Sequence, residues 1–524
     1  MKRILLLLVV CFIAMPSFSQ KDSVAVFYSA NINAKHISKY MHRLVSKEFA
    51  GRETGEPGQK LAAQYIADEF KKSGALPGNG DSYFQNYDLM FSESGGIDLT
   101  INGTEYGWLE DFYTYYKISN QTVETDKVLF LGYGIQNKRW DSFKDLDITN
   151  KVVLVLEGEP KNKRGIYYVS GNKRKSNRVG GNRAKVKILK GRNPAAIIIA
   201  TNQLEKNIKQ YEHWINRKRA ELPATEEESD KEPPVIFISY EAADKLMESK
   251  GIKTGKLSKT IQKKGRPTSF YVKTDLSINV KNKEKIVNVE NVVASVMASE
   301  KTDEWIVVTA HYDHLGEKDE GIYYGADDNA SGTAGVMMMA HTFAEMAKNG
   351  QAPKRNILFM LVSGEEKGLL GSSYYVKNPV IPLENTVCNL NIDMIGRVDE
   401  DHAGNEDYVY LIGSDRLSTE LHEVSEYAAK TYTNLELDYT FNERDDPNRF
   451  YYRSDHYNFA KNNIPVIFYF NGVHEDYHKV TDTIDKISFN KVEKITKLIF
   501  FTAFEIADRE GRLKVNVLED VEEN

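Results

Sequence analysis

Residues 305–349 read WIVVTAHYDHLGEKDEGIYYGADDNASGTAGVMMMAHTFAEMAKN, and the order of apolar and polar residues in this stretch decides the fold. Residues 305–310 form a continuous apolar run of strand length, and residues 332–349 have the length and apolar content of a buried helix. Between them lies a loop rich in glycine, aspartate and histidine. A buried strand followed by a helix is the unit from which parallel sheets covered by helices are built.

The same unit recurs along the second half of the chain. Apolar strands are expected at NILFMLV (356–362), TVCNLNI (386–392) and IPVIFYF (464–470), and a closing helix is expected at residues 490–510. We therefore predict an α/β fold with a mostly parallel, mixed sheet that is covered by helices on both faces.

The middle of the chain has a different texture. From about residue 115, short apolar strands such as KVLFLG and AAIIIAT alternate with long charged stretches. This change predicts a small β-rich domain inserted at residues 115–284. The residues on either side, 20–114 and 285–524, then form two parts of one larger domain.

The N-terminus predicts export. Lys2 and Arg3 precede an apolar run that ends before Pro16, and this pattern is typical of a cleaved secretory signal over residues 1–19. The run is short for a membrane span, so we expect no stable membrane insertion after cleavage and a periplasmic or extracellular location; an uncleaved anchor is the alternative. Cys388 is then the only cysteine left, which excludes an intramolecular disulfide.

The charge balance argues against nucleic acid as the partner of the whole chain. The formal net charge is -6 and the pI is about 6.1, so peptides or small molecules are the expected partners. Residues 161–192 are strongly basic, but no aromatic residues are interleaved as a stacking platform. We interpret this stretch mainly as a solvated loop, with a patch for an acidic polymer as the alternative.

Polar residues follow each expected strand of the larger domain. His311 and Asp313 follow the first strand, Glu365 and Glu366 the second, and Asp393 the third, while NGVHEDYH (471–478) follows the last. In an open α/β sheet these carboxyl ends meet in the binding crevice. Carboxylates gathered there repel one another unless cations balance them, so we expect a divalent metal, with zinc favoured by imidazole and manganese or cobalt also possible.

Spacing suggests individual roles. Two adjacent metals need a shared carboxylate, and Asp328 suits that role because it lies where a helix is expected to begin. His311 and Asp313 point to the same side if the strand continues, so Asp313 can orient the imidazole. Glu365 and Glu366 point in different directions, so one can bind metal while the other handles a proton.

Five motifs in order, together with GRETGEPGQKLAAQYI ahead of them, resemble the secreted zinc aminopeptidases with two co-catalytic metals. Glutamate carboxypeptidase and glutaminyl cyclase are related to the same family. The resemblance covers most of residues 285–510 and implies that the inserted domain is a protease-associated domain. The motifs are AHYDHLG, GADDNASG, SGEEKGLLGS, NIDMIGR and YHKVTDTIDKI.

The resemblance also implies site residues. His311 and Asp393 would hold one Zn²⁺, Glu366 and His478 the other, and Asp328 would bridge the two. Glu365 would be the general base that activates a metal-bridging hydroxide. Tyr477 would stabilise the oxyanion or simply pack. Separately from the resemblance, we expect Asp482, in VTDTID, to support His478 from behind.

Several alternatives stay open at this point. HEDYH (474–478) matches the single-zinc motif H-E-x-x-H, in which Glu475 would be the base, but the stretch has no helical periodicity and we expect a loop. Arg397 would meet a substrate carboxylate or a nearby acid, and His314, His341 and His456 are interpreted as structural or supporting residues.

The resulting prediction is an exported aminopeptidase with two zinc ions that acts on peptides. A carboxypeptidase of the glutamate-releasing type, a glutaminyl cyclase and a non-catalytic binding protein of the same fold are the rivals. The preferred terminal residue and the oligomeric state are not predicted.

Overall fold

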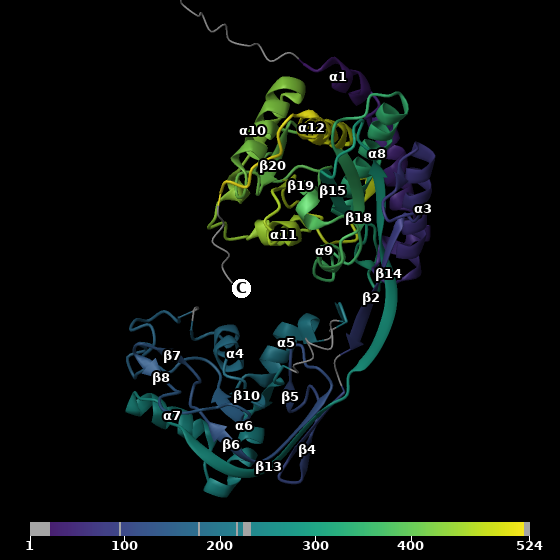
Figure 1. The fold of residues 1–524 in the computed structure, drawn as a ribbon. Coiled ribbons are helices and arrows are strands. Elements are labelled where there is room, and N and C mark those ends of the chain that lie inside the picture. Colours follow the sequence, from purple (N-terminus) through teal and green to yellow (C-terminus); the bar gives the residue numbers. More distant parts are fainter. Residues whose placement is uncertain (1–20, 94–95, 177–178, 216–217, 224–231, 518–524) are drawn as a thin grey trace, which may run out of the picture. The chain divides into compact units, whose positions relative to one another are not determined.

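A computed structural model describes residues 21–93, 96–176, 179–215, 218–223 and 232–517 (Figure 1). The expected signal at residues 1–19 lies outside the described residues. The chain forms two compact units: unit 1 contains the residues up to Asp88 and from Val287 onward, and unit 2 runs from Leu89 to Ile286. The chain passes from one unit to the other within two long strands, β2 (Phe84–Glu93) and β14 (Lys283–Val296).

Unit 1 is built on a mixed sheet. Its strands follow the order β11 (Arg219–Glu221), β2, β14, β18, β15, β19, β22, β20, β21, and the short β1 (Leu76–Pro77) pairs with β14. The four adjacent strands β18, β15, β19 and β22 are mutually parallel, whereas β14 runs antiparallel to β18 and β20 runs antiparallel to β22. The strands are β18 (Asn356–Val362), β15 (Trp305–His311), β19 (Thr386–Ile392), β22 (Val466–Phe470), β20 (Tyr408–Ile412) and β21 (Glu436–Asp438).

Helices cover both faces of this sheet. Along β15, Ile306 and Val308 belong to one buried cluster and Val307 to another, because successive side chains of a strand point to opposite faces. This arrangement confirms the predicted α/β class. The first cluster packs with α1 (Ser23–Ser29), α2 (Ala34–Leu44), α3 (Pro57–Ser73), α8 (Gly332–Lys348), α10 (Thr419–Ala428) and α12 (Phe489–Asp508), and the second with α9 (Leu370–Lys377) and α11 (His456–Ala460).

The start of α8 lies against the sheet because its first residue is glycine. A Cβ on Gly332 would come within 2.5 Å of the carbonyl oxygen of Ile392, at the end of β19. The expected helix start at Asp328 differs from the structure: Asp328 lies in the turn Ala326–Ser331, and the α-helix begins at Gly332. Gly335, one turn further along, lies against Thr496 of α12.

Unit 2 has its own sheet, in which β9, β10 and β12 are parallel. This unit begins at Leu89, whereas the change in the sequence pattern suggested a boundary near residue 115. The unit starts earlier because β3, β4 and β5 belong to its sheet. That it is a protease-associated domain stays a prediction. The strand order is β4 (Thr104–Tyr106), β3 (Ile97–Ile101), β13 (Phe270–Val280), β6 (Gln121–Phe130), β9 (Val152–Leu156), β10 (Ala196–Thr201), β12 (Val235–Ser239) and β5 (Phe112–Tyr113).

Four helices and several short strands complete the architecture. In the described part of the chain, no helix combines the length and the apolar character that crossing a membrane requires. The helices of unit 2 are α4 (Asn182–Lys190), α5 (Leu204–Ile215), α6 (Tyr240–Leu246) and α7 (Thr254–Lys264), and the short strands are β7 (Gln136–Asn137), β8 (Trp140–Asp141), β11 (Arg219–Glu221), β16 (Gly316–Lys318) and β17 (Gly321–Tyr323).

The close approach of α8 to β19 generates a prediction about stability. Gly332→Ala places a methyl group against the Ile392 carbonyl, and we expect it to destabilise the protein by about 1–3 kcal/mol. The thermal unfolding temperature should then fall by roughly 2–10 °C. Gly511→Ala is the matched control in the same unit, since a Cβ there meets no atom within 4 Å. Equal unfolding temperatures for the two variants would contradict the predicted clash.

Candidate metal centre

The carboxyl ends of the four parallel strands bring the predicted site residues together. His311 is the last residue of β15, Asp393 directly follows β19, and Glu365 and Glu366 follow β18 after a two-residue turn. Because these strands are parallel neighbours, the polar residues meet at one edge of the sheet, as the sequence predicted.

One group of three side chains surrounds the ring of His311. Its Nε2 lies 3.2 Å from Oδ1 of Asp328 and 3.3 Å from Oδ1 of Asp393, and all three residues are buried. The Ser454 hydroxyl donates a hydrogen bond to the other oxygen of Asp393 at 2.7 Å. This bond fixes the Asp393 carboxylate with Oδ1 turned toward the histidine.

A second group forms around His478. Its Nε2 lies 3.1 Å from Oδ2 of Asp328 and 3.3 Å from Oε2 of Glu366. Although burial opposes the charged ring, the hydrogen bonds to these two carboxylates raise the pKa of His478 to about 10. The two oxygens of Asp328 therefore face two different histidines, His311 and His478.

Asp482 holds the turn that carries Asp328. Its carboxylate accepts hydrogen bonds from the backbone N–H groups of Asp327 at 3.1 Å and of Asp328 at 3.2 Å. The expectation that Asp482 supports His478 is therefore wrong about the partner, because this loop turns the carboxylate toward the Asp328 backbone. The next residue, Asn329, follows a cis peptide bond and donates to the Ile392 carbonyl at 2.8 Å, which ties the turn to β19.

Asp313 supports the site in a different way from the one expected. The backbone carbonyl of Asp313 lies 3.1 Å from Nδ1 of His311, whereas its nearest carboxylate oxygen lies 3.7 Å away. The carboxylate instead accepts the hydroxyl of Thr54 at 2.6 Å and the backbone N–H of Glu365 at 3.3 Å. It therefore orients His311 through its backbone and Glu365 through its side chain.

His314 contacts the second group, where sequence reasoning assigned it no specific partner. Its Nδ1 lies 2.9 Å from Oε1 of Glu366 and 3.9 Å from Oδ2 of Asp328, and these three residues have the spacing of a metal site. The His314 ring is fully buried, whereas 37% of the His478 side chain is exposed and lines the cavity beside the site. His314 therefore orients Glu366 from the buried side, whereas His478 approaches Glu366 from the side of the cavity.

Arg52, in the GRETGEP segment, is a second residue that sequence reasoning did not select. Its buried guanidinium donates to the carbonyls of Tyr312 at 2.7 Å, Tyr324 at 2.8 Å and Gly325 at 3.0 Å. These bonds join the two ends of the loop between His311 and Asp328. Burial lowers the pKa of Arg52 to about 10, so the residue remains a cation beneath the carboxylates at neutral pH.

A cavity opens beside the two groups, and Glu365 and Tyr477 line it. Burial raises the pKa of Glu365 well above its ordinary value, against the opposing effect of His311. The Tyr477 ring stacks on His478 at 3.9 Å, and its hydroxyl lies 3.4 Å from Nη2 of Arg453. The remaining lining residues are Asp328, Asp393, Arg453, His478 and the apolar Met394, Phe450, Phe468, Phe470 and Val473.

The HEDYH stretch is a turn, as expected, and not a helix. His474 faces Asp327 at 3.2 Å while His478 faces Asp328, so the two rings do not converge on one position, and Glu475 is exposed. The single-zinc alternative is therefore wrong.

The other residues left open also have an explanation. Arg397 pairs with Asp476 at 2.9 Å, which resolves the choice between a substrate carboxylate and a nearby acid in favour of the acid. His456 is buried against Phe468, and burial lowers its pKa to about 3, as suits a structural histidine.

The spacing of the donor atoms fits metal ions. Ligands at about 2.1 Å around a tetrahedral zinc ion lie roughly 3.4 Å from one another. The nitrogen-to-oxygen distances in both groups, 3.1–3.3 Å, are close to that value. Imidazole and carboxylate together are the donor set that suits zinc. The two groups therefore fit two ions that share Asp328.

Comparisons with known proteins support this chemistry. The sequence profile described as Peptidase family M28 matches residues 291–503. A probable zinc metalloprotease of Pyrenophora teres is 34% identical over 113 residues, which are 21% of this chain and 23% of that protein. A probable leucine aminopeptidase of Arthroderma otae is 30% identical over 215 residues, 40% of this chain and 55% of that protein. The chain thus matches about half or less of the length of these relatives.

A solved structure shares the fold over nearly the whole chain. The aminopeptidase from Aneurinibacillus sp. strain AM-1 is 18% identical, and the match has a TM-score of 0.52 and covers 94% of this chain and 98% of that one. The match of residues 291–503 and this shared fold agree with the resemblance carried by the motifs. Residues 291–503 are thus similar to peptidase family M28.

Proposed function

We propose that the chain is an exported exopeptidase with two zinc ions, and specifically an aminopeptidase that removes residues from the N-termini of peptides. The observation that carries the proposal is the placement of Asp328, whose two oxygens face His311 and His478 at 3.2 and 3.1 Å. A carboxylate presented in this way has no use in a site for a single ion.

The donor groups divide between the two positions. Asp328 and Glu366 with His478 would hold one ion, and Asp328 with His311 and Asp393 the other. When bound, two zinc ions polarise the scissile carbonyl and lower the pKa of the attacking water. Export rests on residues 1–19 of the sequence, from which we expect a periplasmic or extracellular protein.

Glu365 is the proposed general base. It lines the cavity without belonging to either donor group, and its backbone N–H is held by Asp313. A carboxylate in this position accepts the proton of the attacking water and then gives it to the amine that leaves when the peptide bond breaks. The raised pKa of Glu365 suits this transfer, because a more basic carboxylate accepts the proton from water more readily and holds it until the amine takes it.

Tyr477 is the proposed donor to the carbonyl oxygen of the substrate. The ring is stacked on His478, so the hydroxyl is held within the cavity beside the second donor group. A hydroxyl there donates a hydrogen bond to the oxygen as it gains negative charge. Packing against His478 is the simpler alternative role.

The cavity favours an amino terminus. Glu365 and Asp393 offer carboxylate oxygens to a substrate ammonium group, and Phe450, Phe468 and Phe470 form an apolar wall for the terminal side chain. The names of two similar proteins, a probable leucine aminopeptidase and an aminopeptidase, agree with this choice.

One observation favours a second candidate, a carboxypeptidase of the glutamate-releasing type. Arg453 lines the same cavity, its side chain is exposed, and it forms no ion pair with any other residue that the structure describes. A guanidinium that has no carboxylate partner among the described residues suits a substrate carboxylate. A glutaminyl cyclase needs one zinc only, and a binding protein has no use for Glu365, so neither accounts for the whole site.

The assignment of the base is tested by a matched pair of variants. Glu365→Gln removes the proton acceptor and keeps the shape, so we expect kcat to fall by at least about 100-fold while both metals stay bound. Glu475→Gln changes the exposed glutamate of the HEDYH turn and should leave kcat close to that of the wild type. The reverse pattern would overturn the assignment.

Metal content tests the shared ligand separately from activity. Asp328→Asn weakens both positions, so the purified variant should lose both zinc ions in elemental analysis. His478→Gln should lose one, because the donors around His311 remain. His474 lies in the same loop as His478 but faces Asp327. His474→Gln should therefore retain two zinc ions, and it serves as the control. Retention of two ions by the Asp328→Asn variant would exclude a bridging role.

Peptides with one blocked end decide between the two exopeptidases. An aminopeptidase needs a free amine, so mass spectrometry should show shortening of C-terminally amidated peptides and none of N-acetylated ones. The opposite result would establish the carboxypeptidase, with Arg453 binding the substrate carboxylate. Arg453→Gln would then abolish the shortening of N-acetylated peptides. Loss of ammonia from peptides that begin with glutamine, without shortening, would identify a cyclase.

A further inference from the structure

Unit 2 carries a charge opposite to that of the chain as a whole. Residues 89–286 contain 36 Lys and Arg against 25 Asp and Glu, whereas the full chain contains 69 against 75. The excess comes from two stretches without acidic residues. Residues 160–204 hold twelve Lys and Arg, and residues 249–274 hold eight.

The two stretches pack against each other. The Tyr168 hydroxyl donates to the carbonyl of Gln262 at 2.9 Å, so the loop that precedes α4 lies on the end of α7. Tyr133 joins the helices themselves: its ring lies 5.6 Å from the ammonium of Lys185 in α4, and its hydroxyl is 3.0 Å from that of Ser258 in α7. The basic residues of both stretches therefore gather in one region of unit 2.

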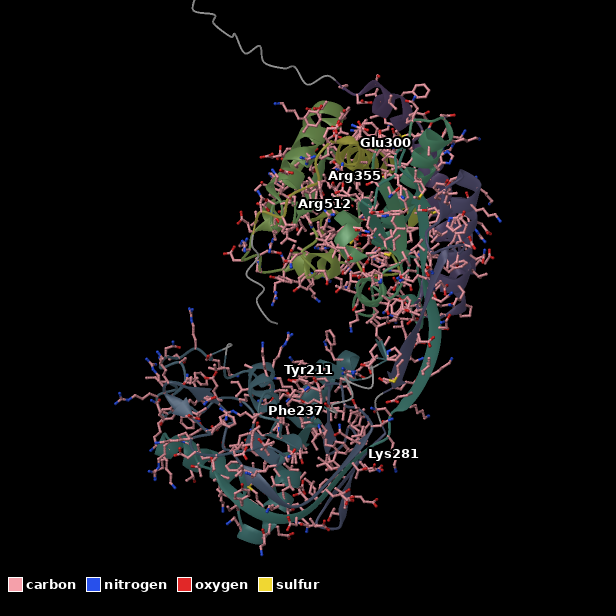
Figure 2. The ribbon with its side chains drawn as sticks, in the orientation of Figure 1. Tyr211, Phe237, Lys281, Glu300, Arg355 and Arg512 are labelled. Atoms are coloured by element: carbon pink, nitrogen blue, oxygen red, sulfur yellow. The ribbon has the colours of Figure 1, made fainter. Side chains whose placement is uncertain are left out.

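Most of these cations point into solvent without a partner. The exposed Lys and Arg of residues 161–187 and 256–266, which we call the cationic face, form no ion pair with other residues in the described part of the chain. Among the described residues of the two stretches, the lysines that pair with a carboxylate are Lys190 and Lys253, and both lie outside the face. Figure 2 shows nitrogen-tipped side chains projecting around α4, α7 and the β7–β8 hairpin.

Such a concentration of like charge works against the folded state, because the cations repel one another. No buried apolar contact or internal ion pair explains their presence. We propose that the cationic face is a docking surface for membranes rich in anionic lipid headgroups. The proposal is independent of the peptidase site, since the face contains none of its residues.

The chemistry of the face favours a lipid surface over a nucleic acid. Lysines, which are compact point charges, outnumber arginines, and clusters of four to eight such residues suffice to hold a protein on an anionic bilayer. Bases would need exposed aromatic rings on which to stack. Tyr167 and Tyr168 are half-buried, and the Tyr168 ring packs against Trp140 at 5.7 Å.

The breadth of the face agrees with a bilayer. Its cations come from a loop, from α4 and from α7 rather than from one line along a groove. None of the described residues in 161–187 and 256–266 is among the exposed large hydrophobic side chains. Docking would therefore be electrostatic and reversible, without insertion.

Vesicle sedimentation of the chain from residue 20 onward tests the proposal. We expect binding to phosphatidylglycerol vesicles, none to phosphatidylcholine vesicles, and release by added salt. Lys259→Glu with Lys263→Glu, both exposed on α7, should weaken binding by at least about thirtyfold. The matched control is Lys206→Glu with Lys209→Glu on α5, which has the same charge change in the same unit.

Three outcomes would overturn the proposal. Equal loss in the two double variants would mean that only net charge matters. Equal binding to both kinds of vesicle would mean that something other than the cationic face binds lipid. Binding to duplex DNA or to an acidic polysaccharide, without binding to phosphatidylglycerol, would assign the face to a soluble polyanion. Circular dichroism and peptidase activity of the variants show that the fold is retained.

Discussion

Mutual repulsion of four carboxylates is the constraint on which unit 1 depends. Asp328, Glu365, Glu366 and Asp393 come from two strand ends and a turn, and the parallel sheet brings them to one edge. Charges gathered in this way are stable only beside cations. Without metal, His311 and His478 supply positive charge. Against the opposing effect of burial, the charges of Asp393 and Glu365 raise the pKa of His311, and hydrogen bonds to carboxylates raise the pKa of His478. Each ring lies between two carboxylates, at the spacing that two ions require.

The rest of the site keeps those carboxylates in their orientations. Asp328 faces two histidines because Asp482 holds its backbone and Asn329 ties the turn to β19. Arg52 closes the loop around them by binding carbonyls, so it contributes charge without competing for any carboxylate oxygen. A residue far from the motifs in sequence is thus part of the same electrostatic balance, which explains why the segment ahead of the inserted unit belongs to the site.

The fold and the main donors could be predicted from the sequence, because apolar runs set the strands and strand ends set the edge at which polar residues meet. The contacts that support the donors could not be predicted from the sequence. Asp482 and His314 belong to loops, where spacing along the chain does not determine the direction of a side chain, and Asp482 therefore contacts Asp328 rather than His478. The start of unit 2 at Leu89 also escaped prediction, because β3 alternates between buried and more exposed residues as β2 does, so no change of pattern marks the boundary.

The two units handle charge in opposite ways, and the difference is informative. In unit 1 the carboxylates of the site lie in the interior and are internally organised, since histidines and backbone N–H groups converge on them. In unit 2 the excess positive charge is exposed and has no internal counterpart among the described residues. A buried charge needs a partner in order to fold, whereas an exposed one tolerates water. Exposed charges that repel one another over two separate stretches therefore add nothing to stability, and a partner outside the chain is the physical reason for keeping them.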